Sequence, residues 1–565
     1  MKKLGKIVLA FIVIILVLQV VGLTILYFVR RIKPHSVLSL RIEGDIPEQA
    51  SQEVISSIVA GPQTTVTDIV EALERARTDP RITGVSLRVG ESTMNMAKIQ
   101  EIREKIRELN GARKFSVAYL EFASTRTYYL ASASQTVILL PKSLLYVRGM
   151  MASATFYRGA LDKLGIYPDL FHIGDYKNAM NVYTEKKFTP AHREATEALL
   201  QDWYQEFLRG VGEARGLKPE EVASLVAKGP FTSQEALAAR LVDRVAYQDE
   251  AREFVKQKNH GSDNRIHLRD YLERTDRESR TKLAVILATG TILPGRSGNT
   301  PFGEEVMGSD TLSEQFRRAR EDNSVKAVIL RVDSPGGVPF ASEVIRREVE
   351  ITKRQKPVVV SMSDVAASGG YWISMSADRI IAEPGTITGS IGVYTGKFNL
   401  RGLYEKLGLS KDLVTTTENS TLDWPFQNFT PAQREIVQQK MRETYNNFLA
   451  GVAAGRRMKV EDVDKIGQGR VWAGERALKL GLVDELGGLD TAISAAKQLA
   501  KIPKSEKVSL LHLPPSKTLF EKLLELAGGA KVASASTSPR LWLQQIESLA
   551  RAPVWAILPA VPEVQ

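Results

Sequence analysis

The sequence predicts an α/β protein made of two tandem repeats, each with a core of parallel strands. The first observation is that the chain repeats itself. Similar strand-like runs end at Val89 and at Val332, 243 residues apart, and each follows a similar amphipathic stretch. The second observation is that short β-branched runs alternate with helical patterns, which is typical of buried parallel strands joined by helices. An interval this long indicates a duplicated domain and not a solenoid.

Each repeat is expected to open with a strand and an amphipathic helix. The strands are predicted at Val37–Ile42 and Leu283–Leu287. The helices follow from apolar residues at i, i+4 and i+7, namely Ile69, Leu73 and Ala76 in the first repeat and Leu312, Phe316 and Ala319 in the second. In the second repeat the next elements are expected to be strand Ala327–Val332, helix Phe340–Lys353, strand Val358–Met362, a helix from Ser368 and strand Ile380–Ala382.

The chain is predicted to divide into five parts. These are a tip with a membrane anchor over residues 1–35, a first repeat over 36–255, a polar linker over 256–280, a second repeat over 281–500 and a C-terminal extension over 501–565. The apolar run Ile7–Val29 is long enough to span a bilayer as one transmembrane helix, and no small-residue cleavage site follows it. Basic residues on its two sides nearly balance, so charge leaves its orientation open.

The composition excludes several kinds of chemistry. The chain has no cysteine, so disulfides, thiol catalysis and thiolate metal sites are excluded. The six histidines are scattered without metal-ligand spacing, and we expect neither a metal nor another cofactor. The net charge of +11 comes from dispersed Lys and Arg, not from a basic stripe, so no nucleic-acid partner is expected. A solvated surface, or one that faces anionic lipid, fits this charge better.

The repeats differ where chemistry is expected. The second repeat carries two glycine pairs, in Asp333–Gly337 and in Ala366–Tyr371, and the first repeat has lost both, with Arg126 taken as the counterpart of Ser368. Conversely, the first repeat carries Gly-Asp-Tyr-Lys ending at Lys177, where the second has Ser420. One repeat therefore keeps a candidate nucleophile and the other a candidate base.

Ser368 is placed for nucleophilic catalysis, between a predicted strand and a predicted helix. A helix N-terminus has free backbone N–H groups, so the amides of Gly337 and Gly369 could form the two-donor oxyanion hole of acyl transfer. A serine needs a base, and no histidine stands at a matched place in the second repeat. Lys177 can serve if burial lowers its pKa. From the residues alone, a solvated surface lysine remains the alternative.

These motifs, together with Gly-Ser-Ile-Gly-Val at Gly389–Val393, resemble the signal peptide peptidase A family in its long, duplicated, membrane-anchored form. The resemblance implies a Clp-like (crotonase-like) α/β fold and a serine endopeptidase without a cofactor. It implies a Ser–Lys dyad with Ser368 as nucleophile and Lys177 as general base. By the same resemblance Ser390 orients the lysine, and Gly337 and Gly369 form the oxyanion hole.

The resemblance also implies partners and a location. The substrates would be cleaved signal peptides and other apolar peptides. The protein would be a homotetramer in contact with membrane lipid, with one span in the bacterial inner membrane and most of the chain on the periplasmic side. Two alternatives stay open: a Clp-like Ser–His–Asp protease that uses His172, and a catalytically inactive membrane scaffold.

Overall fold

The computed structural model describes residues 31–50, 63–275, 279–300 and 305–515, and two strands further on, β25 (Arg551–Ile557) and β26 (Glu563–Val564). The predicted anchor, Ile7–Val29, lies outside these residues. Within the described part of the chain, no helix combines the length and the apolar character needed to cross a membrane.

A six-stranded parallel sheet forms the centre of the first repeat. Its strand order is β10-β5-β3-β2-β1-β11, and every pairing in it is parallel. Its strands are β1 (Ser36–Gly44), β2 (Ile82–Ser92), β3 (Phe115–Leu120), β5 (Thr136–Leu139), β10 (Arg244–Val245) and β11 (Arg265–His267). The last of these lies between the two predicted repeats and extends the first sheet.

Helices and short strands surround this sheet. The helices are α3 (Val66–Thr78), α4 (Met96–Gly111), α5 (Thr125–Ala131), α6 (Arg158–Leu164), η1 (Asn178–Met180), α7 (Asn181–Thr184), α8 (Pro190–Arg215), α9 (Pro219–Val226), α10 (Ser233–Ala238), α11 (Gln248–Lys258) and α12 (Leu268–Thr275). The short strands are β4 (Ala123–Ser124), β6 (Leu144–Tyr146), β7 (Ala152–Ser153) and β9 (Phe231–Thr232).

The second repeat has an eight-stranded sheet, with the main order β22-β20-β18-β16-β12-β24. All of its pairings are parallel except that of β20 with β22. Its strands are β12 (Lys282–Thr289), β16 (Val325–Ser334), β18 (Val358–Ala367), β19 (Arg379–Ala382), β20 (Ile387–Gly389), β22 (Val471–Ala473), β23 (Glu485–Leu486) and β24 (Ser509–Leu513). The prediction of an α/β fold with parallel-strand cores is confirmed.

The helices of the second repeat are α13 (Ser309–Glu321), α14 (Pro339–Lys353), α15 (Gly369–Ser374), α16 (Arg401–Lys406), η2 (Glu418–Thr421), α17 (Pro431–Arg456), α18 (Val460–Ile466), α19 (Gly474–Lys479) and α20 (Leu489–Leu499). The long helices α8 and α17 begin alike because the Phe-Thr-Pro motif is repeated. In each, the threonine side chain caps the helix and the proline takes the first helical position.

The duplication is visible in equivalent side-chain hydrogen bonds. The Tyr128 hydroxyl donates to the Leu241 carbonyl at 2.7 Å, and the Tyr371 hydroxyl donates to the Leu482 carbonyl at 2.9 Å. Likewise, Arg215 pairs with Asp243 in the first repeat and Arg456 pairs with Asp484 in the second. The two repeats therefore share their internal framework and not only fragments of sequence.

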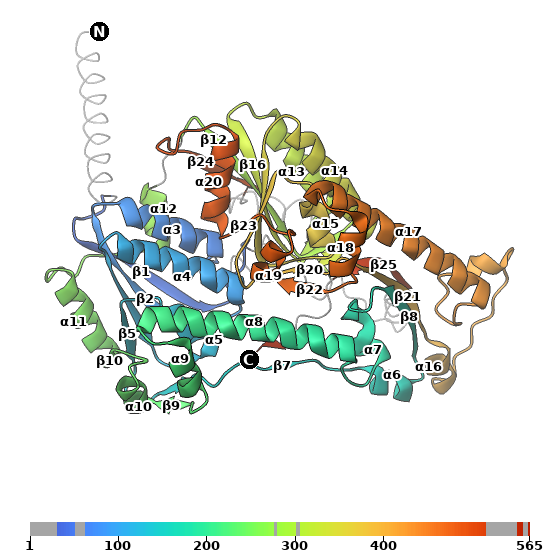
Figure 1. Ribbon diagram of the computed structural model, residues 1–565, viewed down its shortest axis with the longest axis horizontal. Coiled ribbons are helices and arrows are strands. Elements are labelled where there is room, and N and C mark those ends of the chain that lie inside the picture. The colour runs from blue at the N-terminus through green and yellow to red at the C-terminus, as the bar shows by residue number, and fades with distance from the viewer. Residues whose placement is uncertain are drawn as a thin grey trace, which may run out of the picture.

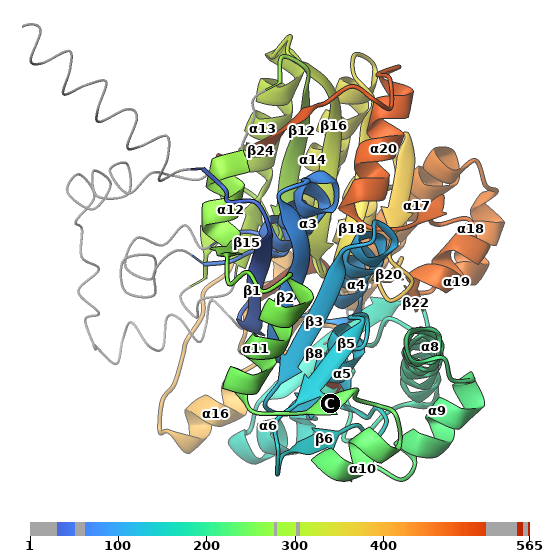
Figure 2. The ribbon, with the colours of Figure 1, turned by 90° about the vertical axis from the view of Figure 1, so that its left-hand side faces the viewer.

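Helix α4 joins the two repeats (Figure 2). It follows β2 of the first repeat but contacts β18 of the second. The backbone N–H groups of Asn95 and Lys98, at its N-terminus, donate to the carboxylate of Asp364 in β18. A helix N-terminus favours a carboxylate there, so this contact fixes α4 against the strand that leads to Ser368.

A third, mixed sheet also crosses between the repeats (Figure 1). Its order is β14-β15-β13-β17-β25-β21-β8. The strands not yet given are β8 (Tyr167–Ile173), β13 (Thr291–Leu293), β14 (Gly298–Asn299), β15 (Glu305–Gly308), β17 (Gly336–Gly337) and β21 (Val393–Asn399). Because β8 of the first repeat pairs antiparallel with β21 of the second, the chain that follows β8 lies against the second repeat.

Candidate active site

Ser368 stands in a tight turn between β18 and α15, as predicted for a strand-to-helix junction. Its φ is +56°, a conformation that costs a residue with a side chain about 1 to 3 kcal/mol. The turn is held by hydrogen bonds from the Ser368 N–H to the Gly389 carbonyl and from the Trp372 N–H to the Ser368 carbonyl, both 2.8 Å. The strain and the fixed backbone present the serine hydroxyl in one direction.

Lys177 of the first repeat meets this serine. Its amine Nζ lies 2.7 Å from Ser368 Oγ, 3.0 Å from Ser390 Oγ and 3.1 Å from the Ser390 carbonyl oxygen. All three residues are completely buried, with an exposed fraction of 0%. The sequence-predicted nucleophile, base and lysine-orienting serine therefore lie together, and both halves come from one chain.

Burial lowers the pKa of the Lys177 amine well below its ordinary value of 10.5. The physical cause is desolvation, which disfavours the charged ammonium. Among the described residues, the hydrogen-bond partners of this amine are neutral oxygens, with no carboxylate to hold its proton. The surroundings therefore favour the uncharged amine, which is the form that can accept a proton.

Residues 468–470, a loop of the second repeat, hold the backbone next to Lys177 and Ser390. The Tyr176 N–H donates to the Gln468 carbonyl, and the Ser390 N–H donates to the Arg470 carbonyl. Gly469 lies between these anchors with φ of +76°, and a Cβ on it would stand 2.5 Å from Lys177 Cβ. Only glycine fits there without displacing the lysine. No sequence motif marks this loop, because its relevance depends on a contact between distant segments.

The two glycine pairs come together beside the serine. A Cβ on Gly369 would lie 2.8 Å from the backbone nitrogen of Gly337 and 2.9 Å from Ser342 Oγ. The Gly336 N–H donates to Ser334 Oγ, whose hydroxyl donates to the Gly290 carbonyl. The backbones at Gly337 and Gly369 thus approach each other more closely than any larger residue at position 369 would permit.

The histidine alternative has a different geometry. His172 is exposed, and its ring nitrogen Nδ1 lies 2.8 Å from the Gly174 carbonyl oxygen, so this contact is with backbone and not with Ser368. His192 is buried against Phe156 and Phe188, and burial lowers the pKa of its imidazole to about 4. It is a packed aromatic of α8.

One expectation about the first repeat is wrong. Arg126 is not the counterpart of Ser368, because the hydrogen bonds of Tyr128 and Tyr371 align the repeats so that Thr125 matches the serine. The Thr125 hydroxyl donates to the Gly149 carbonyl at 3.2 Å. Arg126 instead matches Gly369, so the first repeat has also replaced the small residue that follows Ser368.

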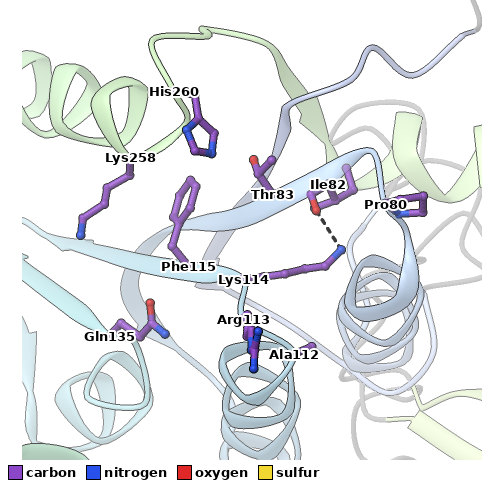
Figure 3. Close-up of a pocket in the computed structure, with 10 residues that line it drawn as sticks. All are labelled: Pro80, Ile82, Thr83, Ala112, Arg113, Lys114, Phe115, Gln135, Lys258 and His260. Carbon is purple, nitrogen blue, oxygen red and sulfur yellow. Dashed lines mark hydrogen bonds between the residues drawn. The ribbon is translucent and has the colours of Figure 1, made fainter.

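A surface depression in the first repeat is separate from this site (Figure 3). It is lined by Pro80, Ile82, Thr83, Ala112, Arg113, Lys114, Phe115, Gln135, Lys258 and His260. The Lys114 ammonium donates to the carbonyls of Ile82 and Ala76, at 2.8 and 2.6 Å. Lys356 makes the equivalent bond to the Ala319 carbonyl in the second repeat, so this lysine belongs to the shared framework.

Comparisons with known proteins agree with the duplicated organisation. Peptidase family S49 matches the chain twice, over residues 108–261 and 350–503. The chain is 32% identical over 516 residues to the chloroplastic serine protease SPPA of Arabidopsis thaliana, covering 89% of this chain and 75% of that protein. It is 35% identical over 451 residues to Protease 4 of Haemophilus influenzae, covering 76% and 72%.

A solved structure of a variant of the 1510-N membrane-bound stomatin-specific protease matches 42% of this chain and 100% of its own, with 17% identity and a TM-score of 0.27. The sequence matches define the class of this protein, a serine peptidase. More particularly, the chain belongs to peptidase family S49, and its relatives carry the names SPPA and Protease 4.

Proposed function

We propose that this serine peptidase is a membrane-anchored endopeptidase that works through a dyad of Ser368 and Lys177. The observation that carries the proposal is the 2.7 Å approach of a buried lysine amine to the serine hydroxyl, with no carboxylate among the described partners of that amine. This distance is the reach expected of a nucleophile and its base.

The proposed reaction begins with the uncharged Lys177 amine. It takes the Ser368 hydroxyl proton while Oγ attacks the carbonyl carbon of the scissile peptide bond. The amides of Gly337 and Gly369 would stabilise the oxyanion, and each such donor contributes about 3 kcal/mol in the transition state. Lys177 then returns the proton to the leaving amine as the C–N bond breaks. In the second step water, deprotonated by the same lysine, attacks the acyl carbon, and the proton passes to Ser368 Oγ as the ester bond breaks.

Ser390 is proposed to orient the lysine. Its hydroxyl and carbonyl oxygens accept hydrogen bonds from Nζ. An uncharged amine held at these two points keeps its lone pair directed at Ser368 Oγ. Its own backbone is in a strained conformation with φ of +51°, like that of the nucleophile.

The substrates are proposed to be cleaved signal peptides and other apolar peptides. The motif resemblance supports this, as does a putative signal peptide peptidase SppA of Enterococcus faecium that is 32% identical over 233 residues. From the same resemblance we propose a homotetramer in contact with lipid, anchored by Ile7–Val29, with most of the chain on the periplasmic side of the bacterial inner membrane.

Hydrolysis of a leucine-rich peptide by the purified full chain tests this function. Ser368→Ala and Lys177→Ala are each expected to reduce turnover to background while leaving the oligomer size unchanged. Lys187→Ala is the matched control, because Lys187 is exposed and lies outside the site. Turnover close to wild type in Lys177→Ala would exclude the dyad, and full loss of activity in His172→Ala would favour the Ser–His–Asp alternative.

A further inference from the structure

Strand β25 fills a gap in the sheet that adjoins the proposed catalytic residues. In the described chain, the sheet order places β25 between β17, which carries the Gly336–Gly337 pair, and β21, which pairs with β8 ahead of Lys177. Figure 1 shows β25, in red, beside β21 and β8. The facing edges of β17 and β21 have no other described strand as neighbour.

The pairing of β25 is antiparallel on both sides. Against β17, Ala556 stands opposite Gly337 and Ile557 opposite Gly336. Against β21, Trp555 stands opposite Tyr394, Ala552 opposite Gly396 and Arg551 opposite Lys397.

The register on the β21 side shifts between Tyr394 and Gly396, where β25 has one residue more than its partner. Pro553 is in that stretch of the sequence, and a proline cannot donate to a ladder, so it belongs at such an irregularity. The strand therefore tolerates its proline without losing its place between the two edges.

Many proteins hold a peptide ligand as an extended segment that pairs with exposed strand edges. Main-chain hydrogen bonds supply the affinity, and such bonds do not depend on the side chains of the ligand. One further fact places the strand position of β25 beside the proposed catalytic residues: residue 556 is paired with Gly337, one of the two proposed oxyanion donors. The sequence from Ala552 to Ile557 is uncharged, as the proposed apolar substrates are.

We propose that residues 551–557 are a resident ligand of the peptide slot, by which we mean the strand position between β17 and β21. They compete there in cis with substrate. This inference rests on the proposed function, because it assigns the slot to substrate. A ligand on the same chain has a high effective concentration, so modest intrinsic affinity is enough for substantial occupancy. Occupancy lowers the fraction of free slots, which raises the apparent KM and leaves kcat unchanged.

Peptide hydrolysis by three full-length or shortened chains tests the proposal. One chain ends at residue 550, one is full-length with Ala552→Pro and Ala556→Pro, and the control is full-length with Ala533→Pro, outside the strand. If the tail occupies the slot about two-thirds of the time, KM falls about threefold in the first two chains, with kcat and the control unchanged. The synthetic peptide Arg-Ala-Pro-Val-Trp-Ala-Ile should then inhibit the shortened chain competitively.

An unchanged KM in both altered chains, with no inhibition by the peptide, overturns the proposal. A fluorophosphonate probe keeps this failure distinct from failure of the proposed function. If Ser368 is labelled in the shortened chain while KM stays unchanged, only the tail inference fails. If no chain is labelled at Ser368, the proposed catalytic site fails and the tail inference fails with it.

Discussion

Lys177 is a basic residue kept in an environment that disfavours its charge. Desolvation is the cause of its lowered pKa, and its described hydrogen-bond partners are neutral. Such a lysine weakens the folded state in exchange for a group that can act as a base, which is a common compromise at active sites.

The rate of peptide hydrolysis should rise with pH through the lowered pKa of Lys177 and level off below pH 10.5. The sign follows because the base must be uncharged, and the fraction of uncharged amine grows as pH rises through its pKa. The measurement is kcat/KM across the neutral and alkaline range. A rate that rises in proportion to hydroxide all the way to about pH 10.5 and only then levels off would mean that the lysine keeps its ordinary pKa.

Lys177→Met should abolish hydrolysis and raise thermal stability at neutral pH. Between the lowered pKa in the folded chain and the ordinary value of 10.5 in the unfolded chain, the unfolded state binds more protons, so the lysine destabilises the fold. Methionine is unbranched and apolar and can occupy the same space. Melting temperatures of the variant and wild type, compared at pH 7 and near pH 10.5, should differ more at the lower pH. A less stable variant at pH 7 contradicts this.

At the scale of elements, a buried ion network fixes the position of the second sheet against the first repeat. Arg331 in β16 donates to Glu48 at 2.8 Å and to Glu101 of α4 at 2.6 Å, and all three side chains are at most 3% exposed. Burial alone would raise the pKa of the Glu48 carboxyl, but Arg331 overcomes it and holds that pKa at about 2. Glu48 therefore remains charged at neutral pH.

Arg331→Met should destabilise the protein by about 3 to 5 kcal/mol, because it leaves two buried carboxylates without their cation. Its sister residue provides the control. Arg88 is the equivalent residue in β2 of the first repeat, but its side chain is 37% exposed and its ion pair with Glu121 is on the surface. Arg88→Met should cost at most about 1 kcal/mol. Urea unfolding of the two variants measures the difference, and equal midpoints would show that the network contributes little.

At the scale of the whole molecule, the repeated sequence predicted the α/β architecture and made Ser368 and Lys177 candidates, whereas their pairing with each other and with Ser390 was expected from the family resemblance. The strands of both sheets are apolar and β-branched, and the complementary loss of motifs pointed to Ser368 in one repeat and Lys177 in the other. The family match supports the same organisation.

Other features depend on contacts between distant segments and left no periodic signal. The antiparallel pairing of β8 with β21, which delivers Lys177, joins segments more than 200 residues apart in sequence. Gly469 matters through its contact with Lys177, a residue of the other repeat. The counterpart of Ser368 is an exception, because the 243-residue interval between the repeats already points to Thr125, and the hydroxyl contacts of Tyr128 and Tyr371 confirm that alignment. The place of β25 depends on two open strand edges that no sequence pattern indicates.

The most direct test of the central claim is the rate at which a fluorophosphonate probe labels Ser368 in the full chain. Lys177→Ala is expected to lower the second-order labelling rate by about 10²- to 10⁴-fold, the usual contribution of a general base. Lys187→Ala should label at the wild-type rate, and Ser368→Ala should not label. Labelling of Lys177→Ala within a few-fold of wild type would contradict the claim that this lysine activates the serine.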